Sequence, residues 1–311
     1  MVNLPANDSQ AELIALKNRI EALENKLALV TKRPYITSAP FLALTAPGQF
    51  APFSTCSTAD FLHPRFAEIC SLLKLGFGWH RKIWEWVFIV HYLLESDVIK
   101  PGNKGLVFGV GMERLPALFA SMGATIVATD APDEISEKTG WKDSGQYSNA
   151  LNGLRHADSF DSNAFDANVS FQRCDMNNIQ AELTGFDFNW SSCCFEHLGS
   201  LEAGIQFVIN AVENTLKVGG IAVHTTEFNL SSNEETVEVG GTVIFRHRDI
   251  IELIERLESR GHIVQPLIVA PDAHYWDFYV DVPPYATIPH LKLMLDKYVA
   301  TSVGIVVRRG K

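Results

Sequence analysis

Two glycines and one aspartate lie at the ends of two predicted strands. The apolar residues 105–108 lead into Gly109 and Gly111, and the next apolar run ends at Asp130. Glycines in such a turn let a ligand approach the backbone, and the helix that follows offers unpaired N–H groups. A carboxylate after the second strand can accept both hydroxyls of a ribose. The pair predicts a site for an adenosine-type cofactor, and a packing turn with a capping aspartate is the alternative.

The spacing around this turn weighs against two other nucleotide-binding motifs. A dinucleotide-binding turn has the pattern G-x-G-x-x-G, and Arg114 occupies its last position. The phosphate-binding pattern G-x-x-x-x-G-K-[ST] does not occur in the sequence. An NAD-dependent oxidoreductase or epimerase therefore stays an alternative that Arg114 weakens.

A third predicted strand also ends in an acid, and here the chain resembles a known family. Asp175 and Met176 close the run that begins at Phe171. From residue 105 to residue 226 the sequence resembles class I S-adenosylmethionine-dependent methyltransferases. Residues 186–198 are similar to a family segment that ends in E-H-L, and residues 216–220 are similar to its L-K-P-G-G turn.

The resemblance implies a cofactor, a product and a set of contacts. S-adenosylmethionine would donate a methyl group and leave as S-adenosylhomocysteine. In the family the glycine turn faces the methionine moiety, the acid after the second strand binds ribose, and the acid after the third strand meets the adenine amine. Val107 and Glu113 depart from the family turn, where an acid and a third glycine are common. The implied cofactor-binding residues are Gly109, Val110, Gly111, Asp130, Asp175, Met176 and Ser192.

Three shorter segments resemble bacterial methyltransferases associated with surface-polysaccharide clusters. They are residues 84–85, 224–229 and 301–304. This resemblance implies methyl transfer to a hydroxyl of a sugar or glycan intermediate, an O-methyltransferase reaction. A non-catalytic, cofactor-binding scaffold is a further alternative.

A hydroxyl acceptor requires a general base with a pKa near neutrality, and histidine is the usual choice. Ligands of open α/β sheets bind at the carboxyl ends of the strands, so the base is expected there. We predict the order His224, Glu227, His197 for the catalytic role.

No metal is expected, because Ser191 to Cys193 lack the acid that metal-dependent O-methyltransferases place after the fourth strand. The predicted substrate-binding residues are Trp141, Gln146, Asn229, Arg246 and His247.

Short apolar runs alternate with helical periods from residue 105 onward. Strands are predicted near residues 105–110, 124–129, 168–174, 186–193, 219–225, 262–269 and 301–308. Helices are predicted near residues 58–75, 80–97, 113–122, 144–155, 201–216 and 247–260. The alternation predicts an α/β fold with a Rossmann-like, doubly wound and mostly parallel sheet, and the resemblance implies the seven-stranded methyltransferase core.

The chain is expected to divide into three units. They are residues 1–33, an oligomerisation helix; 34–100, a linker and helical cap; and 101–311, the methyltransferase domain. Residues 226–243 are either a lid over the acceptor or a surface insertion.

Residues 8–32 form a separate periodic element. Leucine, isoleucine and valine recur there at alternating spacings of three and four, beginning at Leu13. In a parallel pair of helices, Glu12 would face Lys17 of the second copy, and Arg19 would face Glu24. The pattern predicts a coiled coil that makes the protein a homo-oligomer, and an amphipathic helix docked on its own domain is the alternative.

Composition narrows the functional class. The 311 residues carry a net charge of −10, so no general attraction to nucleic acid or anionic membrane is expected. Five cysteines without a C-x-x-C pair weigh against a disulfide framework and a zinc knuckle. The first ten residues lack a signal-peptide pattern, and the most apolar run, residues 83–94, is too short to span a membrane. We therefore expect a cytoplasmic protein that acts on a small molecule or glycan intermediate.

Overall fold

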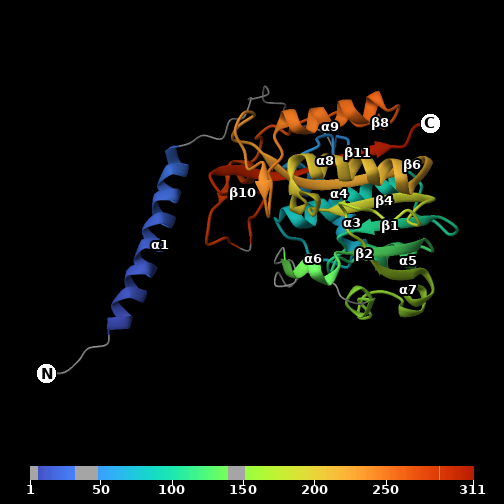
Figure 1. The fold of residues 1–311 in the computed structure, drawn as a ribbon, viewed down its shortest axis with the longest axis horizontal. Coiled ribbons are helices and arrows are strands. Elements are labelled where there is room, and N and C mark those ends of the chain that lie inside the picture. Colours follow the sequence, from blue (N-terminus) through green and yellow to red (C-terminus); the bar gives the residue numbers. More distant parts are fainter. Residues whose placement is uncertain (1–5, 32–47, 139–150, 287) are drawn as a thin grey trace.

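The computed structural model describes residues 6–31, 48–138, 151–286 and 288–311. One sheet forms the centre of the body (Figure 1). Its strands are β1 (Lys104–Phe108), β2 (Thr125–Asp130), β3 (Val169–Arg173), β4 (Phe186–Ser192), β6 (Leu216–Asn229), β8 (Ile263–Val264), β9 (Val280–Asp281), β10 (Lys292–Leu295) and β11 (Tyr298–Arg308). A separate pair joins β5 (Gly199–Ser200) and β7 (Val239–Gly240).

The order of the strands confirms the predicted fold class. The sheet reads β3-β2-β1-β4-β6-β11-β10-β9, and β8 pairs with β11. Strands β1, β2, β3, β4 and β6 run parallel, whereas β11 is antiparallel to β6. The chain runs outward from β1 to β3 and then returns to β4, so its direction across the sheet reverses between β1 and β4. Doubly wound sheets bind ligands at such a switch point.

Helices cover both faces of the sheet. One face carries α2 (Thr58–Leu62), α3 (Pro64–Leu72), α4 (Arg81–Glu95), α5 (Leu115–Ser121) and α7 (Ser162–Asn168). The other carries α8 (Leu201–Asn210), the turn η4 (Ala211–Thr215) and α9 (His247–Ser259). Successive side chains of a strand point to opposite faces, so Val107 packs in the first core and Leu106 and Phe108 in the second.

The segment predicted as a helical cap is part of the first layer. Trp84 and Phe88 of α4 are buried against the sheet. At Gly304 of β11 a Cβ atom would lie 2.2 Å from the Phe88 ring, so the helix packs directly on the strand backbone. This close packing brings the first turn of α4 to the carboxyl ends of β4 and β6.

Differences from the predicted elements have local causes. β6 is longer than residues 219–225 because it pairs with β11 from Ile221 to Asn229. β8 is shorter than residues 262–269, and Pro266, which lacks an N–H donor, lies two residues beyond its end. Of the helix predicted at residues 144–155, the described part is the short turn η2 (Leu151–Leu154). The prediction missed α6 (Asp133–Lys138), α7 and β10.

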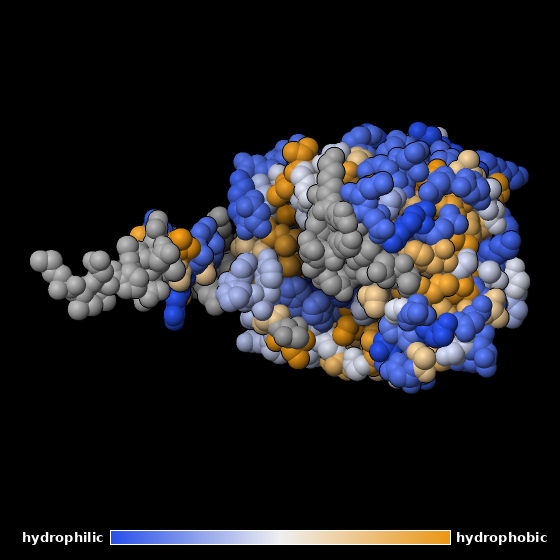
Figure 2. Space-filling view, turned by 60° about the horizontal axis from the view of Figure 1, so that its bottom comes forward, coloured by the Kyte–Doolittle hydropathy of each residue, from blue (hydrophilic) through white to orange (hydrophobic). Residues whose placement is uncertain are grey.

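The helix α1 (Ala6–Thr31) matches the N-terminal periodic element. Leu13, Leu16, Ile20 and Leu23 are 50–57% exposed. Figure 2 shows hydrophobic residues at the surface of this helix, which projects from the body. Within the described ranges, no helix combines the length and the apolar character that crossing a membrane requires.

Candidate functional site

A cavity of about 530 Å³ opens at the carboxyl edge of the sheet. Residues from the ends of five parallel strands meet there, on both sides of the switch between β1 and β4. Its lining includes Gly109, Asp130 and Met176 from the ends of β1, β2 and β3, and Glu196, His197 and Glu227 from beyond β4 and from β6. Three of the seven residues predicted for the cofactor and two of the three predicted for catalysis therefore border one space.

The glycine turn after β1 leaves bare backbone at the cavity. Gly109 and Gly111 have φ angles of 59° and 51°, a region that favours glycine. A Cβ atom at Gly109 would lie 2.9 Å from the Cys194 side chain. Asp130 stabilises the turn, because its Oδ2 accepts the Gly111 N–H at 3.1 Å and its Oδ1 accepts the Ala131 N–H at 2.8 Å. A carboxylate has about four acceptor sites, so it can also receive hydroxyl groups.

A smaller cavity of about 190 Å³ adjoins the turn. Gly109 and Lys82 line both cavities, and Gly111, Glu113 and Ser192 line the smaller one. Burial raises the pKa of Glu113 to about 8, although its Oε1 accepts the indole N–H of Trp190 at 2.7 Å. Glu113 is therefore mostly uncharged at pH 7. Among the described lining residues of the smaller cavity, Lys82 then supplies the charge, which is positive.

The remaining predicted cofactor residues have backbone and side-chain partners. Val110 donates its N–H to the Thr129 carbonyl at 2.9 Å and lines the smaller cavity. Asp175, which directly precedes Met176, accepts the Asn177 N–H at 2.9 Å through its carboxylate. Ser192 ends β4 and donates its hydroxyl to Glu85 at 3.2 Å.

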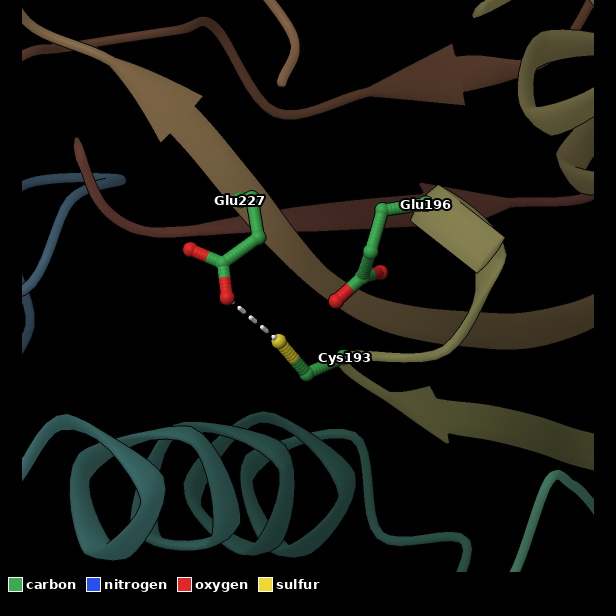
Figure 3. Close-up of side chains that lie close together, drawn as sticks. All are labelled: Cys193, Glu196 and Glu227. Atoms are coloured by element: carbon green, nitrogen blue, oxygen red, sulfur yellow. Dashed lines mark hydrogen bonds between the residues drawn. The ribbon is translucent and has the colours of Figure 1, made fainter. Parts of the chain in front are cut away.

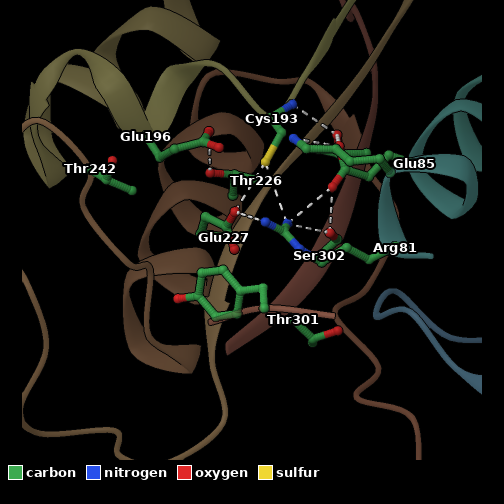
Figure 4. Close-up of polar contacts among 12 residues, drawn as sticks. Arg81, Glu85, Cys193, Glu196, Thr226, Glu227, Thr242, Thr301 and Ser302 are labelled. Carbon is green, nitrogen blue, oxygen red and sulfur yellow. Dashed lines mark hydrogen bonds and ion pairs between the residues drawn. The ribbon is translucent and has the colours of Figure 1, made fainter. Parts of the chain in front are cut away.

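Figure 4 shows a buried network beneath the cavity, centred on Arg81 of α4. Arg81 donates to Glu85 at 3.3 Å, to the Ser302 hydroxyl at 3.0 Å and to Glu227 Oε1. Glu85 Oε2 also accepts from the Thr225 hydroxyl at 3.3 Å. Burial alone would raise the pKa of Glu85, but the charges of Lys82 and Arg81 and the hydroxyl donors lower it below its ordinary value. Glu85 is thus a buried, charged and fully partnered carboxylate.

Cys193, Glu196 and Glu227 converge beside this network (Figure 3). Their thiol and carboxylate atoms lie within 4.8 Å of one another, close enough to share a metal ion. The Cys193 thiol donates to Glu227 Oε1 at 3.3 Å, and burial raises its pKa well above the ordinary value. Arg81 contacts the same carboxylate oxygen and lies 3.6 Å from the sulfur, so a guanidinium already occupies the place of a cation.

His197 is the predicted histidine that lines the cavity. Its Nδ1 lies 2.8 Å from the Gly241 carbonyl oxygen. A carbonyl oxygen only accepts, so Nδ1 carries the proton and the lone pair of the neutral ring is on Nε2. Nε2 lies 3.9 Å from Glu196 Oε1. This tautomer suits a general base that is oriented by its backbone contact.

His224, the first choice for the base, lies on the other face of the sheet. Its side chain is fully buried, with Nδ1 2.7 Å from the Ser191 hydroxyl and the ring packed edge-on to Phe195 and Phe207. Burial lowers the pKa of His224 to about 3. Strand residues alternate between faces, so His224 and Glu227, three positions apart, cannot both reach the cavity. The predicted order did not take this alternation into account.

The predicted substrate-binding residues are not brought together. Asn229 and His247 line a separate cavity of about 510 Å³. Arg246 is buried at the start of α9, where it donates to Asp249 at 2.8 Å and pairs with Glu238 at 2.8 Å, so it has a structural role. Trp141 and Gln146 lie outside the described residues.

The sequence reasoning missed Arg81, Lys82, Cys193 and Glu196 as site residues. A weak signal existed for the first two, because they are the only lysine and arginine of a mostly apolar and aromatic helix. Glu196 stood directly before a predicted histidine. Nothing in the sequence indicated that α4 packs on the strands β6 and β11, and only that packing brings Arg81 and Lys82 to the cavity.

No protein-family model matches the chain, and no curated protein matches it. Several solved structures are similar to it. The DhpI–SAH complex matches with a TM-score of 0.39 and 15% identity, over 71% of this chain and 87% of that one. An S-adenosylmethionine-dependent methyltransferase from Mesorhizobium loti matches with a TM-score of 0.42 and 13% identity, over 72% and 97%. Magnesium protoporphyrin IX methyltransferase from Synechocystis PCC 6803 with bound SAM matches with a TM-score of 0.38 and 12% identity, over 71% and 76%. The fold assignment itself follows from the strand order and pairing described above.

Proposed function

We propose that this protein transfers a methyl group from S-adenosylmethionine to a hydroxyl of a small polar acceptor, a sugar or a glycan intermediate. One observation carries the proposal: a single cavity of about 530 Å³ borders the glycine turn and Asp130 at one side, and His197 and Glu227 at the other. A methyl transfer needs donor and acceptor in one enclosed space, held in line.

The residues present fit the proposed cofactor. Gly109 lines both cavities and has no side chain, so a ligand in either one can approach the backbone of the turn. Asp130 would accept the ribose hydroxyls, and Met176 would contact the adenine. Lys82 would pair with the carboxylate of the amino-acid end, because the smaller cavity beside it is otherwise uncharged near pH 7. When bound, S-adenosylmethionine supplies a methyl group activated by its sulfonium.

His197 replaces His224 as the proposed base. The lone pair on Nε2 would take the proton of the acceptor hydroxyl as the oxygen forms its bond to the methyl carbon. The Gly241 carbonyl holds the opposite side of the ring through Nδ1–H. Glu196, 3.9 Å from Nε2, would stabilise the imidazolium that results. We propose a small-molecule or glycan acceptor and not a nucleic acid, because the net charge is −10.

The test is formation of S-adenosylhomocysteine from S-adenosylmethionine in the presence of a panel of sugars and nucleotide sugars. Acceptor-dependent formation of S-adenosylhomocysteine that is lost in Asp130→Ala supports the proposal. A protein that binds the cofactor but methylates no acceptor would be the scaffold alternative. A protein that binds NAD in its place would be an oxidoreductase or epimerase.

A further inference from the structure

Two buried carboxylate oxygens at the acceptor side of the cavity have no hydrogen-bond partner among the described residues. They are Glu196 Oε1 and Glu227 Oε2. Both side chains are at least nine-tenths buried, and both residues line the cavity of about 530 Å³. A buried acceptor without a partner costs about 1–3 kcal/mol, and more when it is charged. A ligand that donates hydrogen bonds to these two oxygens would remove this cost.

The charges of the same network are unbalanced. The buried group contains three carboxylates, Glu85, Glu196 and Glu227, and two cations, Arg81 and Lys82. Arg81 pairs with Glu85 and Glu227, and Lys82 pairs with Glu85 at 3.5 Å. None of the ion pairs that these two cations make among the described residues reaches Glu196. With His197 neutral and all three carboxylates ionised, one negative charge is left over. Burial makes that unpaired charge costly, and it raises the pKa of Glu196 above its ordinary value.

The chemistry of the pair selects the ligand group. An ammonium group has three donors and one positive charge, so it can donate to Glu196 Oε1 and restore neutrality. One oxygen of Glu196 lies within 4.8 Å of one oxygen of Glu227, so the same group can also contact the Glu227 carboxylate. A hydroxyl group has one donor and no charge. A carboxylate or phosphate at this place would add repulsion to the unpaired charge.

The proposed base lies next to this pair of carboxylates. Glu196 Oε1 lies 3.9 Å from His197 Nε2, the nitrogen proposed to take the hydroxyl proton. A ligand with its ammonium group on Glu196 therefore presents the substituent of the adjacent carbon to His197. We infer that the acceptor is an amino sugar, whose ammonium group binds Glu196 and Glu227 and whose adjacent hydroxyl is methylated. This inference rests on the proposed function.

The experiment compares three sugars that differ in one substituent. Protein saturated with S-adenosylhomocysteine, which carries no sulfonium charge, is titrated calorimetrically with glucosamine, glucose and N-acetylglucosamine. Glucosamine is expected to bind at least about tenfold more tightly than the other two, the effect of one charge-assisted hydrogen bond. Equal or tighter binding of glucose, or no binding of glucosamine up to its solubility limit, would overturn the inference.

Variants assign the effect to the two carboxylates. Glu196→Gln keeps the shape and the contact to the Thr226 hydroxyl but removes the charge. It is expected to abolish the preference for glucosamine over glucose and to leave the affinity for S-adenosylhomocysteine within about threefold. Glu202→Gln, an exposed acid on α8, is the control and should keep the preference. A preference that survives Glu196→Gln and Glu227→Gln would place the amine elsewhere and contradict the inference. Failure of S-adenosylhomocysteine itself to bind would instead overturn the proposed function.

Discussion

Some buried acids and bases of this protein are charged and others are neutral, and the partners of each group determine its charge. Glu85 stays charged because two cations and three hydroxyls surround its carboxylate. Glu113 holds its proton because its carboxyl group is buried and its side-chain hydrogen bond comes from a neutral indole. His224 is neutral because an apolar core of aromatic rings surrounds it. Desolvation acts on all three, and only Glu85 has enough compensation to remain ionised.

Glu113 gives a prediction about pH. Burial raises its pKa in the folded protein from 4.5 to about 8, so the folded state holds a proton that the unfolded state has lost between these values. Stability must therefore fall as pH rises through this window. Glu113→Gln keeps the Trp190 hydrogen bond and carries no charge. The melting temperature of the variant minus that of the wild type should therefore increase as the pH rises from 4.5 to about 8. Asp60, also shifted upward, is present in both proteins and cancels. A difference in melting temperature that does not change with pH would contradict this account.

The two histidines lie on different faces of the sheet, and their variants test which of them is the base. His197→Gln should lower kcat by about 10²–10⁴-fold, the usual contribution of a general base, and leave the affinity for S-adenosylhomocysteine nearly unchanged. His224→Asn should keep kcat within a few-fold and lower the melting temperature, because His224 is a buried structural residue. Both values come from the same assay of S-adenosylhomocysteine formation. Loss of kcat in His224→Asn alone would restore the order predicted from the sequence.

At the scale of elements, the sequence predicted the parallel half of the sheet well and its edge poorly. Strands β1 to β4 lie within a few residues of their predicted positions, because each is a buried apolar run bounded by a helix or a turn. β9 and β10 are four residues or shorter. β10 pairs with β11 and β9 pairs with β10, and no local pattern in the sequence reveals these pairings. The glycine turn and Asp130 were predictable because both lie at the ends of strands with clear boundaries.

The other side of the site was less predictable because it depends on the packing of one helix. Arg81 and Glu85 belong to α4, whose partners lie far along the chain at Glu227 and Ser302. The sequence predicted the helix but not the strands it would cover. The alternation of β6 was also decisive, since it directs Glu227 to the cavity and His224 to the opposite core.

Arg81→Met tests whether α4 and β6 depend on this pairing. The substitution leaves Glu85 and Glu227 buried without their guanidinium, and breaking a buried ion pair costs about 3–5 kcal/mol. Urea unfolding should show this loss at pH 7. Arg248→Met, which removes an exposed pair with Glu234, should cost about 0–1 kcal/mol. Similar costs in both variants would mean that the network does not hold the helix on the strand.

At the scale of the whole molecule, the helix α1 has an apolar stripe that is suited to a partner. The residues Leu13, Leu16, Ile20 and Leu23 are about half exposed. Their spacing and the charges beside them fit a second copy of the same helix, aligned in parallel. We expect a homo-oligomer that is held together by this element.

Leu16→Glu with Leu23→Glu should disrupt that assembly, because it places charges in the apolar seam. Sedimentation or light scattering should find an oligomer for the wild type and a monomer for the double variant. The matched control, Ala15→Glu with Ala22→Glu, places the same charges outside the seam and should stay oligomeric. A wild type that is monomeric at micromolar concentration would refute the coiled-coil prediction. The affinity for S-adenosylhomocysteine should be the same in all three proteins.

The central claim is that the cavity at the ends of β1 to β3 binds an S-adenosyl cofactor. Calorimetric titration with S-adenosylhomocysteine, with NAD as the control ligand, tests it most directly. We predict micromolar binding of S-adenosylhomocysteine, none of NAD, and at least about tenfold weaker binding after Asp130→Ala, which removes the charge-assisted contacts to ribose. Binding of NAD alone, or of neither ligand, would contradict the claim.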